Sequence, residues 1–67
     1  MNLQPQHQRV VDEKQRLDEK RGKLNAYLET ATYHSLSYKQ RYLLNRQSML
    51  MDLYSEVLGE RIQAFYA

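Results

Sequence analysis

Residues 10–28 read VVDEKQRLDEKRGKLNAYL, and the spacing within this stretch decides the fold. Apolar and long side chains recur at intervals of four and three, at Val10, Lys14, Leu17, Arg21, Leu24 and Leu28. This spacing places them along one face of a helix, close to a heptad repeat. On the opposite face Asp12 precedes Arg16 by four residues and Glu19 precedes Lys23, an order that supports a helix. The stretch therefore predicts a long amphipathic helix.

This first helix is predicted to span residues 5–32 and to open at a proline, which the first helical position tolerates. The pattern breaks at residues 30–37, TATYHSLS, where closely spaced hydroxyl side chains compete for the backbone. Ser37 followed by Gln40 is typical of a capping box. A second helix is therefore predicted over residues 38–65.

The second helix repeats the apolar spacing. Its predicted seam consists of Leu43/Leu44, Gln47, Leu50/Met51, Tyr54, Val57/Leu58, Arg61 and Ile62/Phe65. Two long helices joined by a short connection fold back on each other. With the turn near residues 33–36, partners are expected to be Leu17 with Tyr54, Leu24 with Gln47, and Val10 with Arg61. The predicted class is all-α, with one domain over residues 1–67 that forms an antiparallel two-helix hairpin.

A chain of 67 residues buries only a small core, and the absence of cysteine excludes a disulfide as reinforcement. Each helix also carries extra apolar residues beside its seam. We therefore expect copies to pair into a homo-oligomeric helical bundle. The residues predicted for the core or the oligomer interface are Val10, Leu17, Leu24, Leu28, Leu44, Gln47, Met51, Tyr54, Leu58 and Ile62.

Composition excludes several classes of function. Ten basic and eight acidic side chains give a net charge of +2, too balanced for a protein that depends on phosphate-backbone attraction, so a small nucleic-acid-binding regulator is the least favoured function. No catalytic constellation, glycine-rich phosphate loop or histidine pair at metal spacing is present, which predicts a non-enzyme without metal or cofactor. No signal peptide and no apolar run of roughly 18 residues is visible, so a cytoplasmic, membrane-free protein is expected.

Polar residues that interrupt the seams have two interpretations. In the structural one, Lys14 and Arg21 extend their charged ends to water, Arg61 pairs with Glu13, and a buried Gln47 fixes the register. In the functional one, some of these side chains line a polar pocket between protomers and hold an anionic ligand, because guanidinium binds phosphate bidentately.

Tyrosine is unusually frequent, with six copies: Tyr27, Tyr33, Tyr38, Tyr42, Tyr54 and Tyr66. Tyr54 is expected in the core. Tyr38 and Tyr42 share a helix face beside basic residues, which fits either ordinary surface tyrosine or a patch that binds a partner. The predicted ligand contacts are Lys20, Tyr38, Tyr42, Arg46 and Arg61.

Several runs of the sequence resemble a family of short phage and prophage helical-hairpin proteins first catalogued in crAss-like phages. The first half matches through residues 7–14 HQRVVDEK and 17–20 LDEK, and the second through 43–47 LLNRQ and 58–62 LGERI. The resemblance extends from residue 7 to residue 65, with Tyr33 where the family has phenylalanine. It implies a helical hairpin that works in the cytoplasm of an infected or lysogenic bacterial host, but it supplies no established activity.

By shape alone, the expected hairpin is similar to phage sponge proteins that sequester the cyclic oligonucleotide signals of CBASS and Thoeris immunity. Those sponges hold the ligand between protomers with aromatic and basic residues, although no motif of theirs matches this chain. The likeness implies a host-takeover or anti-defence protein that sequesters a cyclic di- or trinucleotide. The alternative is a helical adaptor or inhibitor that binds a host protein through an exposed helix face.

Overall fold

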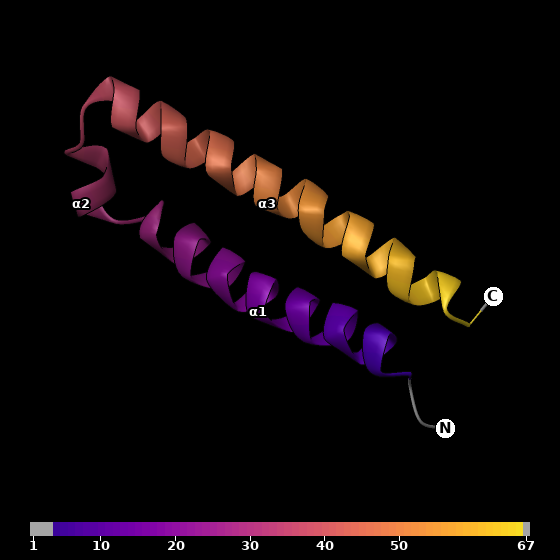
Figure 1. Ribbon diagram of the computed structural model, residues 1–67. Coiled ribbons are helices and arrows are strands. Elements are labelled where there is room, and N and C mark those ends of the chain that lie inside the picture. Colours follow the sequence, from indigo (N-terminus) through magenta and orange to yellow (C-terminus); the bar gives the residue numbers. More distant parts are fainter. Residues whose placement is uncertain (1–3, 67) are drawn as a thin grey trace.

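The computed structural model describes residues 4–66 and shows a helical hairpin (Figure 1). Helices α1 (Pro5–Tyr27) and α3 (Tyr38–Ala64) run antiparallel, and the short α2 (Ala31–His34) lies between them at the turn. The predicted all-α class and the packing of two long helices are confirmed, whereas assembly of several copies stays a prediction. The domain predicted over residues 1–67 extends beyond the described residues at both ends.

The first helix ends at Tyr27, so its predicted end at residue 32 is wrong. The Thr30 hydroxyl donates to the Tyr27 carbonyl at 2.7 Å and accepts from the Tyr33 N–H at 3.2 Å. One threonine thus closes α1 and caps the unpredicted α2, because its oxygen satisfies backbone groups at both helix ends. The predicted start of α3 is confirmed, since the Ser37 hydroxyl accepts from the Gln40 N–H at 3.2 Å.

Packing between the two long helices centres on Leu58, which is 0% exposed. Leu58 packs with the buried Val10 and Leu17, and the partly buried residues around this cluster are Met51, Ile62 and Phe65. On α1 the observed contact line follows the predicted seam. On α3 it runs through Leu44, Ser48, Met51, Ser55, Leu58 and Ile62.

The predicted α3 seam is right at Leu44, Met51, Leu58 and Ile62. Gln47, Tyr54 and Arg61 are exposed and lie one residue before the true contact positions Ser48, Ser55 and Ile62, which is about 100° around the helix. Ser55 stands where Lys14 and Arg21 cross the interface, and Ser48 bonds to Asn25. A Cβ added at Gly59 would lie 3.4 Å from Lys14 Cε, an ordinary van der Waals contact.

Aromatic side chains close both ends of the interface. At the turn, the buried Tyr33 hydroxyl donates to the Arg41 carbonyl at 3.4 Å and accepts from the Asn45 side-chain amide. At the open end, the His7 and Phe65 rings stack with their centroids 3.9 Å apart. These contacts limit fraying where the hairpin has the fewest apolar neighbours.

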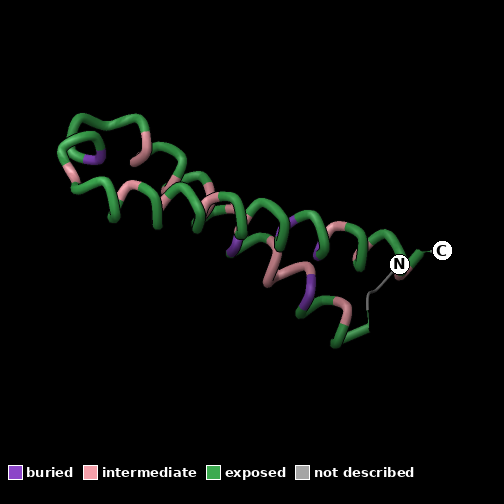
Figure 2. The backbone as a smooth tube through the Cα atoms, turned by 90° about the horizontal axis from the view of Figure 1, so that it is seen from above, coloured by how far each residue is buried: buried purple, intermediate pink, exposed green. Residues whose placement is uncertain are grey.

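Burial is sparse along the whole hairpin, and most residues of both long helices are exposed (Figure 2). The exposed large apolar side chains in the described part of the chain include Tyr38, Tyr42, Leu43, Met49, Leu50, Leu53, Tyr54 and Val57, all of them on α3. Apolar side chains tolerate single exposure, but a continuous set of this size on one helix marks a surface that binds something.

Candidate functional site

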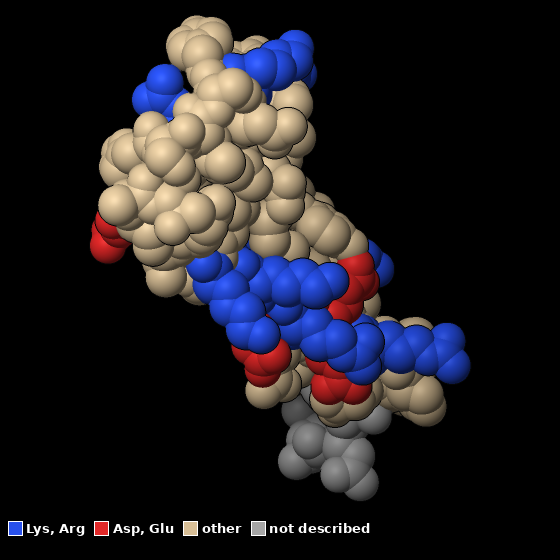
Figure 3. Space-filling model, turned by 90° about the vertical axis from the view of Figure 1, so that its left-hand side faces the viewer, with Lys and Arg blue, Asp and Glu red and all other residues tan. Residues whose placement is uncertain are grey.

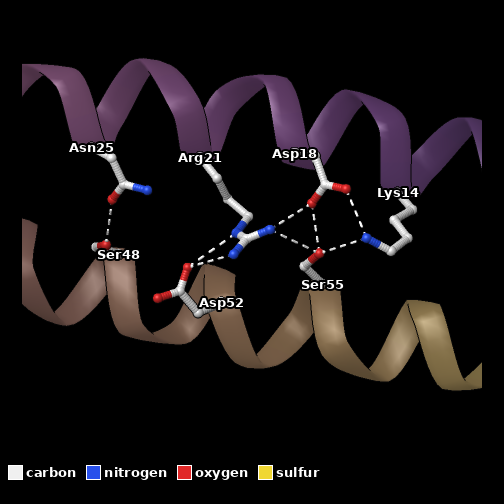
Figure 4. A network of polar contacts seen from close by, with 7 residues as sticks. All are labelled: Lys14, Asp18, Arg21, Asn25, Ser48, Asp52 and Ser55. Carbon is white, nitrogen blue, oxygen red and sulfur yellow. Dashed lines mark hydrogen bonds and ion pairs between the residues drawn. The ribbon is translucent and has the colours of Figure 1, made fainter.

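A polar network crosses the middle of the hairpin around Ser55, which is 2% exposed (Figure 4). The Ser55 hydroxyl donates to Asp18 Oδ1 at 2.6 Å and accepts from Lys14 Nζ at 3.0 Å and Arg21 Nη1 at 3.1 Å. Asp18 also pairs with Lys14 at 2.7 Å and with Arg21 at 2.8 Å. Since a hydroxyl has one donor and two acceptor positions, the buried serine is fully satisfied.

The same network continues towards the turn. Arg21 binds Asp52 Oδ1 through Nε and Nη2, both at 3.0 Å, and the Ser48 hydroxyl donates to Asn25 at 3.1 Å. Both contacts place the α3 partner about three residues later than predicted, close to one helical turn. Lys14 and Arg21 thus fix the register of the two helices, which corrects the prediction that they simply extend into water.

Two other differences from the sequence predictions concern Asp18 and Arg61. Asp18, which the sequence did not single out, points into the interface between α1 and α3. Arg61 was expected to pair with Glu13, yet the ion pairs formed within residues 4–66 do not include this one. The physical reason is the rotation of α3 about its axis, which puts Ile62 in the seam and leaves Arg61 exposed.

Hydrogen bonds in the network shift two pKa values. Those from Lys14, then Ser55 and Arg21, hold the pKa of Asp18 well below its usual range. Hydrogen bonds from Arg21 to Asp18 and then Asp52 raise the pKa of its guanidinium above the ordinary value. Asp18 and Arg21 are therefore charged at neutral pH, and both cations of the network, Lys14 and Arg21, are already paired with Asp18.

Acid should weaken the hairpin through Asp18. Because its pKa is lowered on folding, the stability it contributes is present above the unfolded value of about 3.9 and is lost as the pH falls further. We expect the melting temperature to drop mainly between about pH 4 and pH 2. Asp18→Asn should melt lower at neutral pH and lose less over that interval. Equal slopes for the two proteins in thermal denaturation would contradict the assignment.

The predicted ligand contacts fall into separate groups. Tyr38, Tyr42 and Arg46 follow one another at four-residue intervals on the outer face of α3, and all three are exposed. Arg61 lies on the same helix about 22 Å further along its axis. Lys20 is exposed on α1. The structure therefore brings Tyr38, Tyr42 and Arg46 together on one face of α3. Arg61 and Lys20 lie apart from this face.

Arg46 and Lys20 line two grooves that share one residue, Tyr54. One, of about 470 Å³, runs along α3 and is lined by Leu43, Arg46, Gln47, Leu50, Met51 and Tyr54. The second lies between the long helices and is lined by Glu13, Arg16, Leu17, Lys20 and Tyr54. Tyr54 belongs to both, so its exposed ring stands between Arg46 on one side and Arg16 with Lys20 on the other. We call these four residues the basic–aromatic groove.

Charge distinguishes this side of the hairpin from the opposite one. The groove on the opposite side is lined by Val11, Lys14, Gln15, Asp18, Glu19 and Ile62. It presents two carboxylates, and its lysine is already bound to Asp18, so it does not suit an anion. Viewed from the turn, Lys and Arg side chains gather together with Asp and Glu side chains in the lower part of the molecule, below a broad uncharged surface that has further basic side chains at its top (Figure 3).

A family model described as Sequestin matches residues 4–64, which include both long helices, the network and the basic–aromatic groove. The chain belongs to the Sequestin family. No curated protein and no solved structure matches it.

Within this Sequestin-family chain, sequence reasoning missed two residues of the groove. Arg16 was assigned to a solvated charged face, and Tyr54 was assigned to the core. Lys20 and Arg16 are four residues apart on one helix face, which could have suggested a pair. Their position beside Tyr54 depends on the register of α1 against α3, which the helix periodicity alone does not give.

The described residues of this Sequestin-family chain show two further features. No group of three His, Asp or Glu side chains within residues 4–66 is placed to hold a metal ion. None of the helices in that part is both long and apolar enough to cross a bilayer.

Proposed function

We propose that this member of the Sequestin family is a non-enzymatic phage protein that sequesters a small anionic nucleotide between protomers. The ligand class is a cyclic di- or trinucleotide immune signal, so the protein would counteract host defence. The family name supports a sequestering role. The observation that carries the proposal is the position of the exposed Tyr54 ring beside Arg16 and Lys20.

Arg16 and Lys20 are available to a ligand. The ion pairs within residues 4–66 engage Lys14 and Arg21 but neither of these two side chains. Glu13 lines the same groove, so its three charged groups carry a net charge of +1. A guanidinium holds phosphate oxygens bidentately, and a tyrosine ring stacks on a base with about 1–3 kcal/mol. Phosphate and base are the two parts that every cyclic oligonucleotide presents.

Closure of the groove needs a second copy. Sites for small molecules usually bury most of the ligand surface, whereas the grooves of one hairpin are shallow and lie beside exposed apolar side chains. A nucleotide held between protomers would be enclosed from both sides. This arrangement also explains why the basic–aromatic groove borders the apolar surface of α3.

Binding is tested by titrating cyclic di- and trinucleotides, with linear mononucleotides for comparison, in calorimetry and thermal denaturation. A ligand at a hundred times its Kd should stabilise the protein by about 2.7 kcal/mol. Arg16→Gln should weaken binding about tenfold or more, because a charged hydrogen bond is lost. Lys39→Gln is the matched control, since it removes one exposed positive charge outside the groove and should leave affinity unchanged.

No heat and no thermal shift with the whole panel would refute the proposal. The alternative, an adaptor that binds a host protein, is favoured by the exposure of Tyr38 and Tyr42 on the outer face of α3. An adaptor should capture one host protein in a pull-down experiment, and the Tyr38→Ala/Tyr42→Ala double variant should no longer capture it. Arg16→Gln should leave that capture intact.

A further inference from the structure

Helix α3 carries a second heptad line of side chains that the hairpin does not use. This outer stripe consists of Leu43, Gln47, Leu50, Tyr54, Val57 and Arg61. Its apolar members are 44–60% exposed. The alternating spacing of four and three continues over about 27 Å of helix and is the pattern by which one helix packs along another. In a single hairpin this stripe has no helix against it.

We infer that the outer stripe binds the same stripe of a second copy, with the two α3 helices antiparallel around a two-fold axis. This inference deepens the proposed function, since it names the protomer contact on which that function rests. One register uses the whole stripe. It places Leu50 of one copy opposite Tyr54 of the second copy, Gln47 opposite Val57, and Leu43 opposite Arg61.

Charge complementarity selects this register. Arg46, Leu53 and Glu60 follow one another at seven-residue intervals along the outer edge of the stripe, and all three are exposed. In the antiparallel register Arg46 of each copy lies opposite Glu60 of the other, while Leu53 meets its own copy at the two-fold axis. The contact is thus self-complementary, as a two-fold interface requires.

Other arrangements lose this complementarity. A parallel pair would stack Arg61 on Arg61 and bring like charges together. An antiparallel pair shifted by one heptad would place Arg46 opposite Leu53 and leave one end of the stripe without a partner. The observed sequence of the stripe and its edge therefore favours one orientation and one register.

The inner edge of the stripe connects the interface to the part of the ligand site formed by Arg16, Lys20 and Tyr54. Arg46, on the outer edge, pairs with Glu60 of the second copy and takes no part in ligand binding in the dimer. Arg21 binds Asp52, so Lys20 is level with Leu53 and hence with the two-fold axis. The dimer therefore sets the two Lys20 side chains at nearly the same height on one side of the paired α3 helices, and each Arg16 lies about one helical turn from the axis, in opposite directions. Because these cations repel each other, an anion at this position should strengthen the dimer. A ligand with its own two-fold symmetry fits such a site.

Charge reversal tests the register with the full chain in sedimentation and native mass spectrometry. Arg46→Glu and Glu60→Arg should each weaken the dimer by about tenfold or more, because two repulsive pairs replace two attractive ones. The double variant should restore it. Circular dichroism should show intact helices in all three, since both residues are exposed. A double variant as weak as either single variant, or single variants as strong as the parent, would overturn the inference.

Cross-linking provides a second test, because the chain contains no cysteine. Leu53→Cys should give a covalent dimer with a short bismaleimide. Gln15→Cys is the matched control, as it is exposed on α1, lines the groove on the opposite side of the hairpin and should stay monomeric. Equal cross-linking of the two variants would contradict the proposed axis.

Both tests are run without nucleotide, which separates this inference from the proposed function. A dimer that passes them but binds no nucleotide would refute only the sequestering role. A chain that binds nucleotide as an oligomer but fails both α3 tests would refute only the α3 interface.

Discussion

Leu58→Ala is expected to reduce the stability of the hairpin by about 2–5 kcal/mol, the range for removing a large side chain from a closed core. Leu58 has the lowest exposure of the buried side chains and contacts Val10 and Leu17 from the opposite helix. A domain of this size has only about 3–10 kcal/mol in total. The variant should therefore melt at least about 10 °C lower, or be unfolded at room temperature.

Thermal denaturation followed by far-UV circular dichroism measures this effect. Met49→Ala is the matched control, because Met49 is on the same helix, is 65% exposed and lies outside both the seam and the outer stripe. It should change stability by less than about 0.5 kcal/mol. A Leu58→Ala protein that melts with the parent would show that the helices do not pack as described.

Ser55→Leu is expected to have the second largest effect, a loss of about 1–3 kcal/mol from overpacking. Ser55 occupies the narrow position where Lys14 Nζ and Arg21 Nη1 approach within 3.0 and 3.1 Å. A leucine there would displace both cations and remove the donor to Asp18. The change therefore combines a steric conflict with the loss of three hydrogen bonds.

Ser55→Ala separates these two causes. It removes the hydroxyl but adds no volume, and the partly exposed Lys14 and Arg21 can still bind Asp18, so the expected loss is about 1 kcal/mol. The parent, Ser55→Ala and Ser55→Leu should thus fall in that order in urea denaturation. Ser55→Leu as stable as the parent would contradict the view that a small residue is required opposite the two cations.

Helix periodicity and capping residues predicted the structure correctly where its cause lies within a few residues of the chain. The repeat from Val10 to Leu28 predicted α1 and its contact face, and Ser37 predicted the start of α3. The same reasoning predicted the end of the first helix wrongly and missed α2. The Thr30 hydroxyl closes one helix and caps the next, and a sequence pattern does not distinguish these two roles from the general preference of threonine for loops.

The candidate site was predicted less well than the fold. Lys20 and Arg46 do line the basic–aromatic groove, but Arg16 and Tyr54 were assigned elsewhere. Tyr38, Tyr42 and Arg61 lie outside these grooves. Such a site combines residues from two helices, so its members are defined only when the register between α1 and α3 is known.

What the sequence by itself determined is a pair of amphipathic helices, since helix periodicity and capping depend on neighbours within about one turn. On α3, apolar residues come in adjacent pairs at 43/44, 50/51 and 57/58. Two lines with heptad spacing, about 100° apart around the helix, could therefore face α1 equally well by periodicity alone. Only the tertiary structure decided between them. Lys14 and Arg21 need the small Ser55 opposite, and Ser48 bonds to Asn25, so this line of α3 faces α1 and the other line, with Leu50 and Tyr54, points outward.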